Sequence, residues 1–310
     1  MLIRFEDLTN ELRGGAVTIG NFDGVHRGHA QLVRRLVEAA GRCGGPSLVL
    51  TFDPHPLAVL RPELAPVPLT TASRRAELLA TLGVDGVVVC RSSPELLSLT
   101  AEEFFRRVLV EKLGARAIVE GPNFFFGRGR AGDVRLLGEL CVGGGVELTI
   151  VEPELTDGEW ISSSRVRELV QQGEVGAARK LLTAPHRARG VVVRGAARGA
   201  GLGFPTANVG QVETLVPGPG VYAGRACVSG RSWPAAIHVG PIPTFGVATH
   251  VIEAHLLDFS EDIYGRSIDV DFLERIRTVR KFNGLDELKL QLTADVAEAR
   301  RLASQLGNQP

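Results

Sequence analysis

A glycine-rich turn with two histidines constrains this chain more than any other stretch. Residues 20–29 read Gly-Asn-Phe-Asp-Gly-Val-His-Arg-Gly-His and directly follow the apolar run 16–19. Apolar residues at helical spacing come next, at Ala30, Leu32, Val33, Leu36 and Val37. The order of strand, turn and helix predicts one unit of a parallel α/β sheet. The start of such a helix favours phosphate groups, through its free backbone N–H groups and its dipole.

His26 and His29 lie at the mouth of the predicted helix. Only Arg27 and Gly28 separate the two imidazoles, so both can reach one anion, and Gly28 lets that anion approach the backbone. Two solvated histidines in a polar loop are the alternative interpretation. A single histidine would favour that alternative, but the His-x-Gly-His spacing at a strand-to-helix turn favours a phosphate site.

Residues 1–185 alternate strand-like and helix-like segments. The expected strands are 16–20, 47–52, 86–90, 116–120 and 146–151, each rich in Val, Ile or Leu. The expected helices are 27–40, 71–82, 101–113, 133–141 and 174–182, and Thr100 with Glu103 predicts a capping box on the third. This alternation predicts a doubly wound parallel sheet with helices on both faces. Such sheets bind ligands at the carboxyl ends of their strands.

Two polar loops follow predicted strands of this sheet. The segment Thr51-Phe52-Asp53-Pro54-His55-Pro56 is either a stiff loop that orients His55 or an ordinary surface turn. Residues 121–133 hold three consecutive phenylalanines and two arginines, which suit an aromatic ligand and a phosphate, although one ring is expected to be core. The Gly-x-Gly-x-x-Gly pattern in this loop does not predict a dinucleotide fingerprint, because that fingerprint directly follows the first strand.

A serine-rich segment follows the fifth predicted strand. It reads Ile161-Ser162-Ser163-Ser164-Arg165-Val166-Arg167 and leads into a helix. One hydroxyl is expected to cap that helix. The other hydroxyls, the first backbone amides and the arginines predict a second phosphate cradle.

The pattern changes near Pro185, which divides the chain into predicted domains 1–185 and 186–310. Short Val-rich strands are expected at 187–194, 220–228, 233–239, 250–259 and 267–273, with a hairpin turn at Ser229-Gly230. A closing helix is expected at 284–306, with Leu285, Leu288, Leu292 and Val296 on one face. These elements predict a small antiparallel β-barrel with a C-terminal helix.

The second domain carries its own candidate residues. Residues 201–208 read Gly-Leu-Gly-Phe-Pro-Thr-Ala-Asn, in which Thr206 and Asn208 offer oxygen ligands for a hard cation such as Mg²⁺. An ordinary turn remains the alternative for this segment. Glu253 is an acid within an apolar strand, where alternation places it on one face with Val251, His255 and Leu257. A carboxylate at a barrel rim is a candidate general base.

Composition excludes several other classes of function. The 35 acidic and 35 basic residues balance, which argues against a nucleic-acid partner held by bulk charge. The four cysteines form no metal or disulfide pattern, and Cys90 is expected to be a buried thiol. No apolar run approaches the roughly 20 residues that cross a bilayer. We therefore expect a cytoplasmic protein without a membrane partner, and the oligomeric state stays open.

Taken together, the motifs resemble those of the prokaryotic bifunctional riboflavin kinase/FMN adenylyltransferase family, the FAD synthetases. The turn at 20–29, the loops at 51–56 and 121–127, and the segment 161–167 resemble its nucleotidylyltransferase domain. The motifs at 201–208, 220–223, 243–246 and 253–259 resemble its riboflavin kinase domain. The resemblance implies ATP-dependent phosphorylation of riboflavin to FMN, and adenylylation of FMN to FAD with release of pyrophosphate. It implies Mg²⁺ as cofactor and riboflavin, FMN and ATP as small-molecule substrates.

The resemblance also implies a role for individual residues. It implies ATP contacts at Gly20, Asn21, Phe22, Gly24, His26, Gly28, His29, Ser163, Ser164, Arg167, Gly201, Gly203 and Thr206. It implies flavin contacts at Phe52, His55, Pro56, Asn123, Phe124, Phe204, Pro205 and Glu253. Glu253 would deprotonate the ribityl hydroxyl, and Thr206 and Asn208 would bind the Mg-nucleotide. His26, His29 and Arg167, together with Mg²⁺, would position the substrates of the adenylyl transfer and neutralise their charge.

Three residues of the second domain depart from the family pattern. His238 stands where Asn is usual, Val251 where Thr is usual, and Val279 where an acid is common. One alternative is therefore an adenylyltransferase with an altered or inactive kinase domain. A flavin sensor without catalysis is the other, but such a protein needs no pyrophosphate cradle.

Overall fold

The computed structural model describes residues 1–153, 155–156, 158–195, 199–241 and 250–306. The chain divides into two compact units, Met1–Ser163 and Ser164–Pro310. Among the helices of the described residues, none combines the length and apolarity that crossing a membrane requires.

The first unit is built on a parallel sheet of six strands in the order β1-β4-β3-β2-β5-β6. The strands are β1 (Leu2–Arg4), β2 (Ala16–Ile19), β3 (Ser47–Phe52), β4 (Gly86–Cys90), β5 (Ala117–Glu120) and β6 (Glu147–Ile150). The five strands predicted from the sequence are confirmed. The short β1 was not predicted, because three residues carry too little periodicity to identify an edge strand.

Helices connect these strands and cover both faces of the sheet. They are α1 (Arg27–Cys43), α2 (Pro56–Leu60), α3 (Ala72–Thr81), α4 (Pro94–Leu97), α5 (Ala101–Phe104) and α6 (Val134–Gly144). A π-helical segment, Phe105–Lys112, continues α5, and the predicted capping box of Thr100 and Glu103 is confirmed. Short 3₁₀ turns lie at Phe5–Asp7, Asn10–Leu12, Pro62–Leu64 and Arg128–Arg130, and β7 (Leu155–Thr156) pairs with β8 (Glu159–Trp160).

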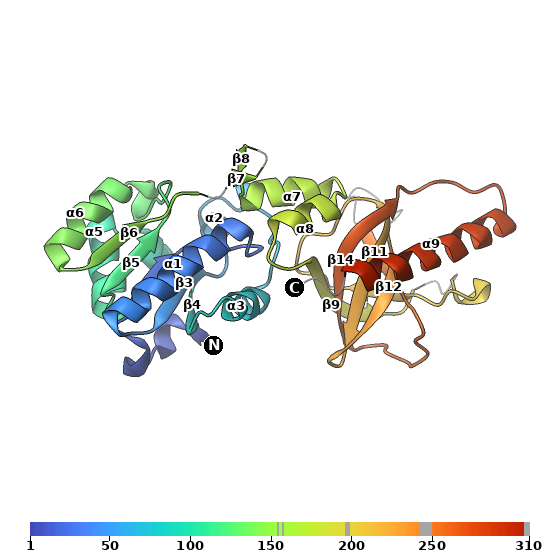
Figure 1. Ribbon diagram of the computed structural model, residues 1–310, viewed down its shortest axis with the longest axis horizontal. Helices are drawn as coiled ribbons and strands as arrows, with labels where there is room; N and C mark the ends of the chain where they lie inside the picture. Colours follow the sequence, from blue (N-terminus) through green and yellow to red (C-terminus); the bar gives the residue numbers. More distant parts are fainter. Residues whose placement is uncertain (154, 157, 196–198, 242–249, 307–310) are drawn as a thin grey trace. The chain divides into compact units, whose positions relative to one another are not determined.

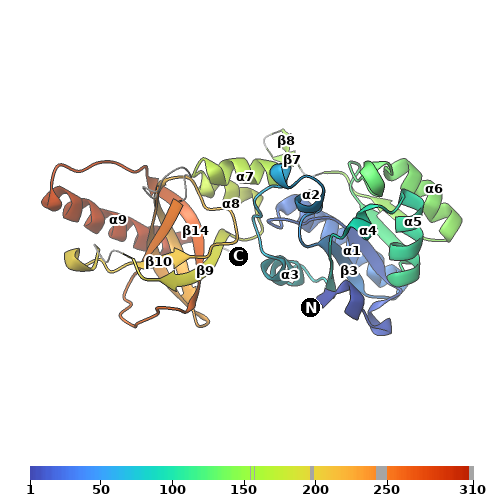
Figure 2. The same ribbon diagram turned by 180° about the vertical axis from the view of Figure 1, so that it is seen from behind.

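Different helices cover the two faces of the sheet. Buried residues of α5, the π-helical segment and α6 pack with Val17, Leu48 and Ile118. Helix α1 lies over β2, β3 and β5, where its Val33 and Leu36 are completely buried. Figure 1 shows α1 in front of the strands, and Figure 2 shows α4 and α5 on the opposite side. The predicted doubly wound arrangement is therefore confirmed.

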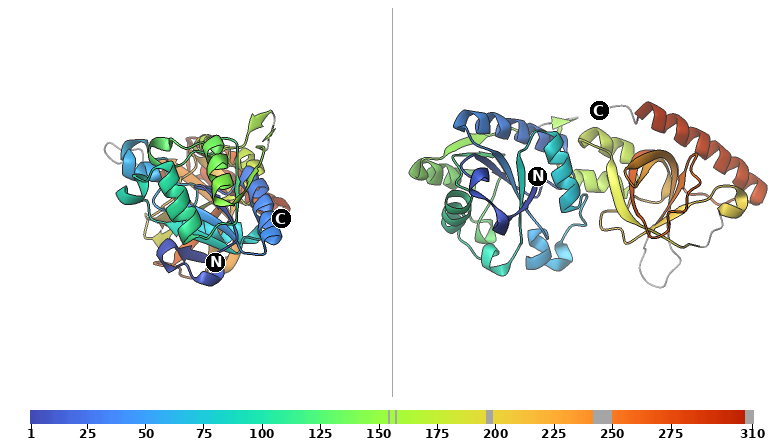
Figure 3. Two further views of the ribbon diagram at one scale, coloured as in Figure 1. Left: turned by 90° about the vertical axis from the view of Figure 1, so that its left-hand side faces the viewer. Right: turned by 90° about the horizontal axis from the view of Figure 1, so that it is seen from below.

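The second unit is a closed antiparallel barrel in the order β10-β13-β12-β11-β14-β9. Its strands are β9 (His186–Val193), β10 (Ala207–Gly210), β11 (Gly220–Val228), β12 (Arg231–Pro241), β13 (His250–Leu256) and β14 (Ser267–Arg277). Its helices are α7 (Ser163–Gln171), α8 (Val175–Leu181) and α9 (Leu285–Leu306), with a 3₁₀ turn at Ala200–Leu202. In the right-hand view of Figure 3 the barrel is seen nearly end-on, with α9 along its side. The hairpin turn at Ser229-Gly230 is confirmed, with positive φ at both residues.

Strand β10 is a correction to the sequence interpretation, which assigned no strand to residues 207–210. This segment pairs with both β9 and β13 and so closes the barrel. Only Ala207 and Val209 point into the core, and Gly210 ends the strand. Two small inward residues give a weak period-two signal, so only the pairing partners reveal the strand.

The predicted apolar face of α9 is only partly covered. Leu285 is 69% exposed, whereas Leu288, Leu292 and Val296 are half-buried. The buried residues of the helix are Asp295, Ala299 and Ala303, and the helix packs on β11, β12 and β14. Arg277 of β14 donates two hydrogen bonds to Asp295, from Nη2 at 2.7 Å and from Nε at 3.0 Å. Small side chains let the helix approach closely, and the ion pair satisfies the one buried charge.

Helix α8 belongs structurally with the barrel. It packs on β14 and β9, and its Val175 is completely buried among the apolar residues of the barrel core. The predicted boundary at residue 185 assigns α8 to the first domain, whereas its contacts are with the barrel. The boundary itself stays a prediction.

We therefore predict that a fragment of residues 164–310 is more stable than a fragment of residues 187–310. The shorter fragment loses Val175 from the core, and a large-to-small loss at such a site costs about 2–5 kcal/mol. Thermal unfolding followed by circular dichroism compares the two fragments. Equal midpoints would show that α8 contributes nothing to the barrel.

Candidate functional sites

The turn between β2 and α1 is held by its own two histidines. His26 is the N-cap of α1, and its Nδ1 accepts a hydrogen bond from the backbone N–H of His29 at 3.3 Å. The Nδ1 of His29 accepts in return from the backbone N–H of His26, also at 3.3 Å. This is a capping box in which imidazoles replace the usual hydroxyl and carboxylate. The two backbone N–H groups are therefore satisfied locally.

The same arrangement determines the protonation of both rings. The rings stack with centroids 3.5 Å apart. Burial lowers the pKa of His26 to about 4, although nearby Asp23 opposes the effect. Burial also lowers the pKa of His29 well below its ordinary value, and repulsion from Arg75 and from His26, were that ring protonated, lowers it further. Both rings are therefore neutral, with Nδ1 as acceptor and the proton on Nε2.

This protonation state bears on one sequence expectation, that His26 and His29 position the substrates of the adenylyl transfer and neutralise their charge. That role stays a prediction. The neutral rings present two Nε2–H donors. Desolvation is the physical reason that they are neutral, since burying two adjacent cations costs more than the ring nitrogens gain by protonation.

Three residues that sequence analysis did not select anchor this turn. The buried carboxylate of Asp23 accepts from the backbone N–H of Leu69 at 2.9 Å and from the Thr70 hydroxyl at 2.8 Å. The Thr70 hydroxyl also accepts from the N–H of Gly24, which has a positive φ of 82°. The guanidinium of Arg75 lies 3.9 Å from Asp23. Asp23 could have been selected from the sequence, because it is an acidic residue inside a glycine-rich turn.

Phe22, Gly28 and Gly20 shape the turn around the histidine pair. Phe22 is buried, with its ring centroid 4.8 Å from that of His29, so it supports the histidine pair. A Cβ at Gly28 would meet the His26 ring at 3.2 Å, so a larger residue there would crowd the histidine pair. Gly20 donates its N–H to Leu50 at the end of the neighbouring strand.

The loop after β3 meets this turn. The Nδ1 of His55 accepts from the N–H of Leu57 at 3.1 Å, which caps α2. The side-chain amide nitrogen Nδ2 of Asn21 lies 2.9 Å from the Nε2 of His55. Pro56 is the first residue of α2, and Phe52 packs against the apolar cluster of the sheet. Asn21 and His55, predicted separately as nucleotide and flavin contacts, are thus in direct contact.

The loop after β5 divides its three phenylalanines as expected. Phe126 is 5% exposed and belongs to the core, which confirms that one ring is structural. Phe124 is half-buried and stacks on Phe126 at 5.4 Å between centroids. Phe125 is exposed beneath the guanidinium of Arg130. Asn123 is exposed at the start of the loop.

Ser163 connects the serine-rich segment to the histidine turn. Its Oγ donates to the backbone carbonyl of Asp23 at 2.8 Å. Ser163 is also the first residue of α7, whose first two turns carry Ser164 and Arg167. The first unit ends at Ser163, so Ser164 and Arg167 are counted with the second unit.

In the second unit, three polar side chains form a row across neighbouring strands. The registers β10–β13 and β12–β13 pair Asn208 and His238 with the same residue, Glu253. The Nδ1 of His238 lies 3.3 Å from Oε2 of Glu253, and both side chains are about two-fifths exposed. The residues that flank Glu253, Ile252 and Ala254, face the barrel core. The row therefore lies on the outer face of the barrel.

The loop before β10 is held against this row. The Nδ1 of His255 donates to the backbone carbonyl of Pro205 at 2.7 Å. Its ring meets the edge of Phe204 at 5.7 Å between centroids. Thr206 precedes β10 by one residue and shares a side of the chain with Asn208. Gly201 and Gly203 are exposed in the same loop.

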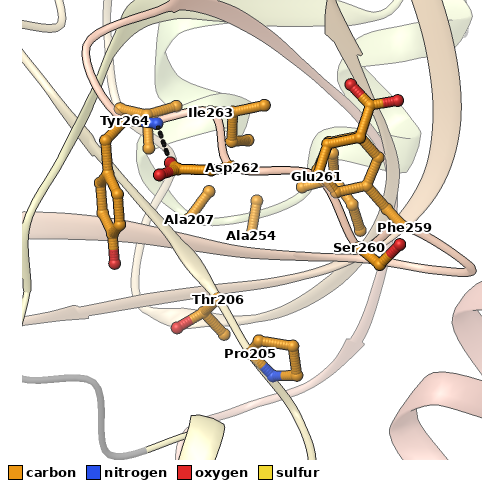
Figure 4. A pocket seen from close by; sticks show the side chains of 12 residues that line it. Pro205, Thr206, Ala207, Ala254, Phe259, Ser260, Glu261, Asp262, Ile263 and Tyr264 are labelled. Atoms are coloured by element: carbon orange, nitrogen blue, oxygen red, sulfur yellow. Dashed lines mark hydrogen bonds between the residues drawn. The ribbon is translucent and has the colours of Figure 1, made fainter.

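A pocket of about 280 Å³ opens beside Thr206. Its lining residues are Val192, Pro205, Thr206, Ala207, Ala254, Leu256, Phe259, Ser260, Glu261, Asp262, Ile263 and Tyr264. Figure 4 shows Tyr264 and Phe259 at two sides of the pocket, with Ala207 and Ala254 between them. The carboxylate of Asp262 accepts from the N–H of Tyr264 at 3.0 Å. Small floor residues between aromatic walls suit a flat aromatic group.

Three further features that the sequence singled out in the second domain are the motif at 243–246, Val251 and Val279. The motif at 243–246 lies outside the described residues. Val251 is half-buried on the outer face of β13, and Val279 is 44% exposed beyond the end of β14. In the part of the chain that the structure describes, no cluster of three or more His, Cys, Asp or Glu side chains could hold a metal ion.

Comparison with known proteins assigns a family to each part of the chain. Residues 8–165 match the family described as FAD synthetase, and residues 182–303 match the family described as riboflavin kinase. These matches cover the β2–α1 turn in the first case and the barrel in the second.

Curated relatives extend over nearly the whole chain. The bifunctional riboflavin kinase/FMN adenylyltransferase of Pseudomonas fluorescens is 40% identical, covering 96% of each chain. The protein of the same name from Escherichia coli K12 is 37% identical, covering 93% of this chain and 92% of its own. The Bacillus subtilis protein of that name is 33% identical and covers 96% of each chain. A crystal structure titled as a macrolide-efflux protein from Streptococcus pneumoniae is also similar, with a TM-score of 0.87 and 33% identity over 96% of this chain and 98% of its own.

The lowered histidine pKa values lead to a prediction. The imidazole of His26 should stay neutral down to about pH 5, because its pKa is about 4. Below about pH 6.5 the His26 ring binds a proton in the unfolded chain but stays neutral in the folded protein. The free energy of unfolding therefore decreases as the pH is lowered. The loss from His26 is on the order of 2 kcal/mol between about pH 7.5 and 5.

Nuclear magnetic resonance of ¹³C-labelled histidine measures this titration directly. The variant His26→Asn assigns the signal, and its side-chain oxygen can still cap α1. A His26 signal that titrates near the ordinary pKa of about 6.5 would contradict the neutral pair.

Proposed function

This chain belongs to the bifunctional riboflavin kinase/FMN adenylyltransferase family, and on that basis we propose how its two units divide the two reactions. It is an enzyme that phosphorylates riboflavin to FMN and adenylylates FMN to FAD. We propose that the α/β unit performs the adenylyl transfer and that the barrel performs the phosphorylation. The two family matches support this division, because each covers a different unit.

In the adenylyl transfer, a phosphate oxygen of FMN attacks the α-phosphorus of ATP. The new P–O bond forms while the bond to the bridging oxygen breaks, and pyrophosphate leaves with the electron pair. The stacked pair of His26 and His29 is the observation that carries this proposal. Two neutral Nε2–H donors, held rigidly at the start of α1, can bind phosphate oxygens without reorganising during the reaction.

The surrounding loops supply the remaining contacts. We propose that His55, Asn123 and Phe124 contact the flavin, with Phe52 and Pro56 shaping its loop. Asn21 and Ser163 would bind ATP beside the histidines. Ser164 and Arg167 would bind the β- and γ-phosphates, because a helix start with a hydroxyl and a guanidinium suits such groups.

In the kinase reaction, Glu253 would accept the proton of the ribityl hydroxyl as its oxygen attacks the γ-phosphorus of ATP. The bond to the β,γ-bridging oxygen breaks, and ADP leaves. Glu253 is suited to this role because it is partly exposed on the outer face of the barrel, where a substrate can approach it. The pocket beside Thr206 would hold the adenine, since its walls carry Phe259 and Tyr264 and the small residues Ala207 and Ala254 lie between them.

The residues present fit Mg²⁺ as a partner of the nucleotide. Thr206 and Asn208 offer neutral oxygen ligands on the side of the chain that faces Glu253 across the strand pair. A Cβ at Gly195 would lie 2.3 Å from the Asn208 amide nitrogen. The absence of a side chain at this glycine therefore gives the Asn208 amide the space that it occupies. The bound metal would neutralise phosphate charge. These few protein ligands suit Mg²⁺, which keeps waters and binds substrate phosphates.

We further propose a cytoplasmic enzyme that acts on small molecules, without a nucleic-acid or membrane partner. The zero net charge and the four free cysteines support this proposal, since reduced thiols are usual in a reducing compartment.

His29→Ala should stop FAD formation while riboflavin phosphorylation continues. Removal of one preorganised donor typically lowers kcat by ~10²–10³. His29→Gln keeps an N–H donor near the position of Nε2 and should retain more activity than the alanine variant. Chromatographic separation of riboflavin, FMN and FAD measures both reactions in one assay. An equal fall of both activities in folded protein would contradict the two-site division.

Glu253→Gln should remove most FMN formation while riboflavin still binds. The amide preserves shape but cannot accept the proton, and loss of a general base lowers the rate by ~10²–10⁴. Fluorescence quenching of riboflavin measures binding separately from turnover. Undiminished turnover would mean that another residue is the base.

His238→Asn is the complementary variant, and we expect it to leave kinase activity intact or to raise it. The substitution restores the residue that is usual in the family and frees Glu253 from its imidazole neighbour. If the native protein converts FMN to FAD but never phosphorylates riboflavin, the barrel is a flavin-binding platform. A strong fall in kinase rate would instead show that His238 assists Glu253.

A further inference from the structure

Glu120 ends β5 with a buried carboxylate that neither reaction uses. The residue is 2% exposed. Its Oε1 accepts from the backbone N–H of Ile19 at 2.6 Å and from the Thr18 hydroxyl at 3.3 Å. The N–H of Gly121 is a further donor to the carboxylate. The carboxylate is therefore enclosed by the ends of β2 and β5.

Strands β2 and β5 separate at this level of the sheet. Their register ends at the pair Val17 and Ile118. On their other sides, β2 stays paired with β3 up to Ile19, and β5 stays paired with β6 up to Glu120. The carboxylate of Glu120 takes the place of the missing backbone acceptor for Ile19. The two strands are therefore joined by a side chain where their ladder has stopped.

This separation lies at the point where the strand order reverses. From β2, the sheet continues through β3 and β4 on one side and through β5 and β6 on the other. Ligands of open α/β sheets bind outside the carboxyl ends of the strands at such a point. The turn after β2 carries His26 and His29, and the loop after β5 carries Asn123 and Phe124.

Burying an acid between the ends of β2 and β5 has a desolvation cost. Burial raises the pKa of Glu120 well above its ordinary value, and the hydrogen bonds from Ile19, Thr18 and Gly121 only oppose that rise. An apolar side chain would avoid the desolvation cost but would leave the Ile19 N–H without an acceptor. The carboxyl group thus stabilises one specific spacing of the two strand ends.

We propose that Glu120 is a positioning residue for the adenylyl transfer, which sets the distance between the histidine turn and the Asn123 loop by bridging β2 and β5. This inference rests on the proposed function of the first unit. Nucleotide and flavin groups held by two loops react only when the loops are correctly spaced, and a misplacement of about 1 Å can cost ~10² in rate.

Two conservative variants distinguish the effect of the side-chain length at position 120 from the effect of its carboxyl group. Glu120→Gln keeps the length of the side chain and a carbonyl oxygen for Ile19. Glu120→Asp keeps the ionisable carboxyl group but is one methylene shorter, so it cannot bridge both strands without moving them. A positioning role predicts that kcat for FAD formation falls less than about fivefold in the glutamine variant. In the aspartate variant it should fall by ~10-fold to 10²-fold, with smaller changes in KM.

Two controls distinguish positioning from loss of stability. Riboflavin phosphorylation in the same samples should be unchanged, because it belongs to the barrel. Leu109→Ala creates a cavity in the core of the first unit, with an expected cost of about 2–5 kcal/mol, and should leave kcat for FAD formation within about threefold while the protein is folded.

The outcomes decide between the possibilities. An active aspartate variant with an inactive glutamine variant would overturn the proposal, because charge and not reach would then matter. A loss in the aspartate variant no larger than in Leu109→Ala would also overturn it, since Glu120 would be structural only. Native protein that forms no FAD at all would instead contradict the proposed function itself.

Discussion

The reciprocal hydrogen bonds between His26 and His29 are the interaction on which the first site depends. Each ring accepts the other residue's backbone N–H through Nδ1, so the helix start, the ring stacking and the position of both protons are one arrangement. Burial alone would leave the tautomer undefined. The two caps define it, and they leave both Nε2–H groups as donors. Asp23 then ties this turn to residues 69–70, just before α3, so that a second segment of the fold holds the donors in place.

The second site depends on strand register instead of on a helix start. Side chains alternate between the core and the outer face of a barrel, so Glu253 points outward because Ile252 and Ala254 point inward. Pairing then places Asn208 on one side of Glu253 and His238 on the other. A shift of one residue in any of the three strands would turn its polar side chain into the core. The apolar interior of the barrel thereby specifies the polar row on its surface.

Sequence analysis was most successful where a pattern is local. The five long strands of the sheet, the capping box at Thr100 and the turn at Ser229-Gly230 each depend on neighbouring residues, and all are confirmed. It failed where the decisive partner is distant. Strand β10 exists because β9 and β13 pair with it, and the buried residues of α9 are Asp295, Ala299 and Ala303, which the spacing of its leucines did not indicate. Helical periodicity cannot distinguish an apolar stripe that is covered from one that stays exposed.

By itself, the sequence determined the order of the elements, the two families and the identity of most candidate residues. Those properties follow from short motifs and from periodicity, which each segment carries alone. Only the tertiary structure decided the protonation of the histidine pair, the contact of Asn21 with His55 and the bridge from Glu120 to Ile19. These depend on burial and on distances between residues far apart in the chain. Desolvation and hydrogen bonding act on atoms that folding has brought together, so no single segment encodes them.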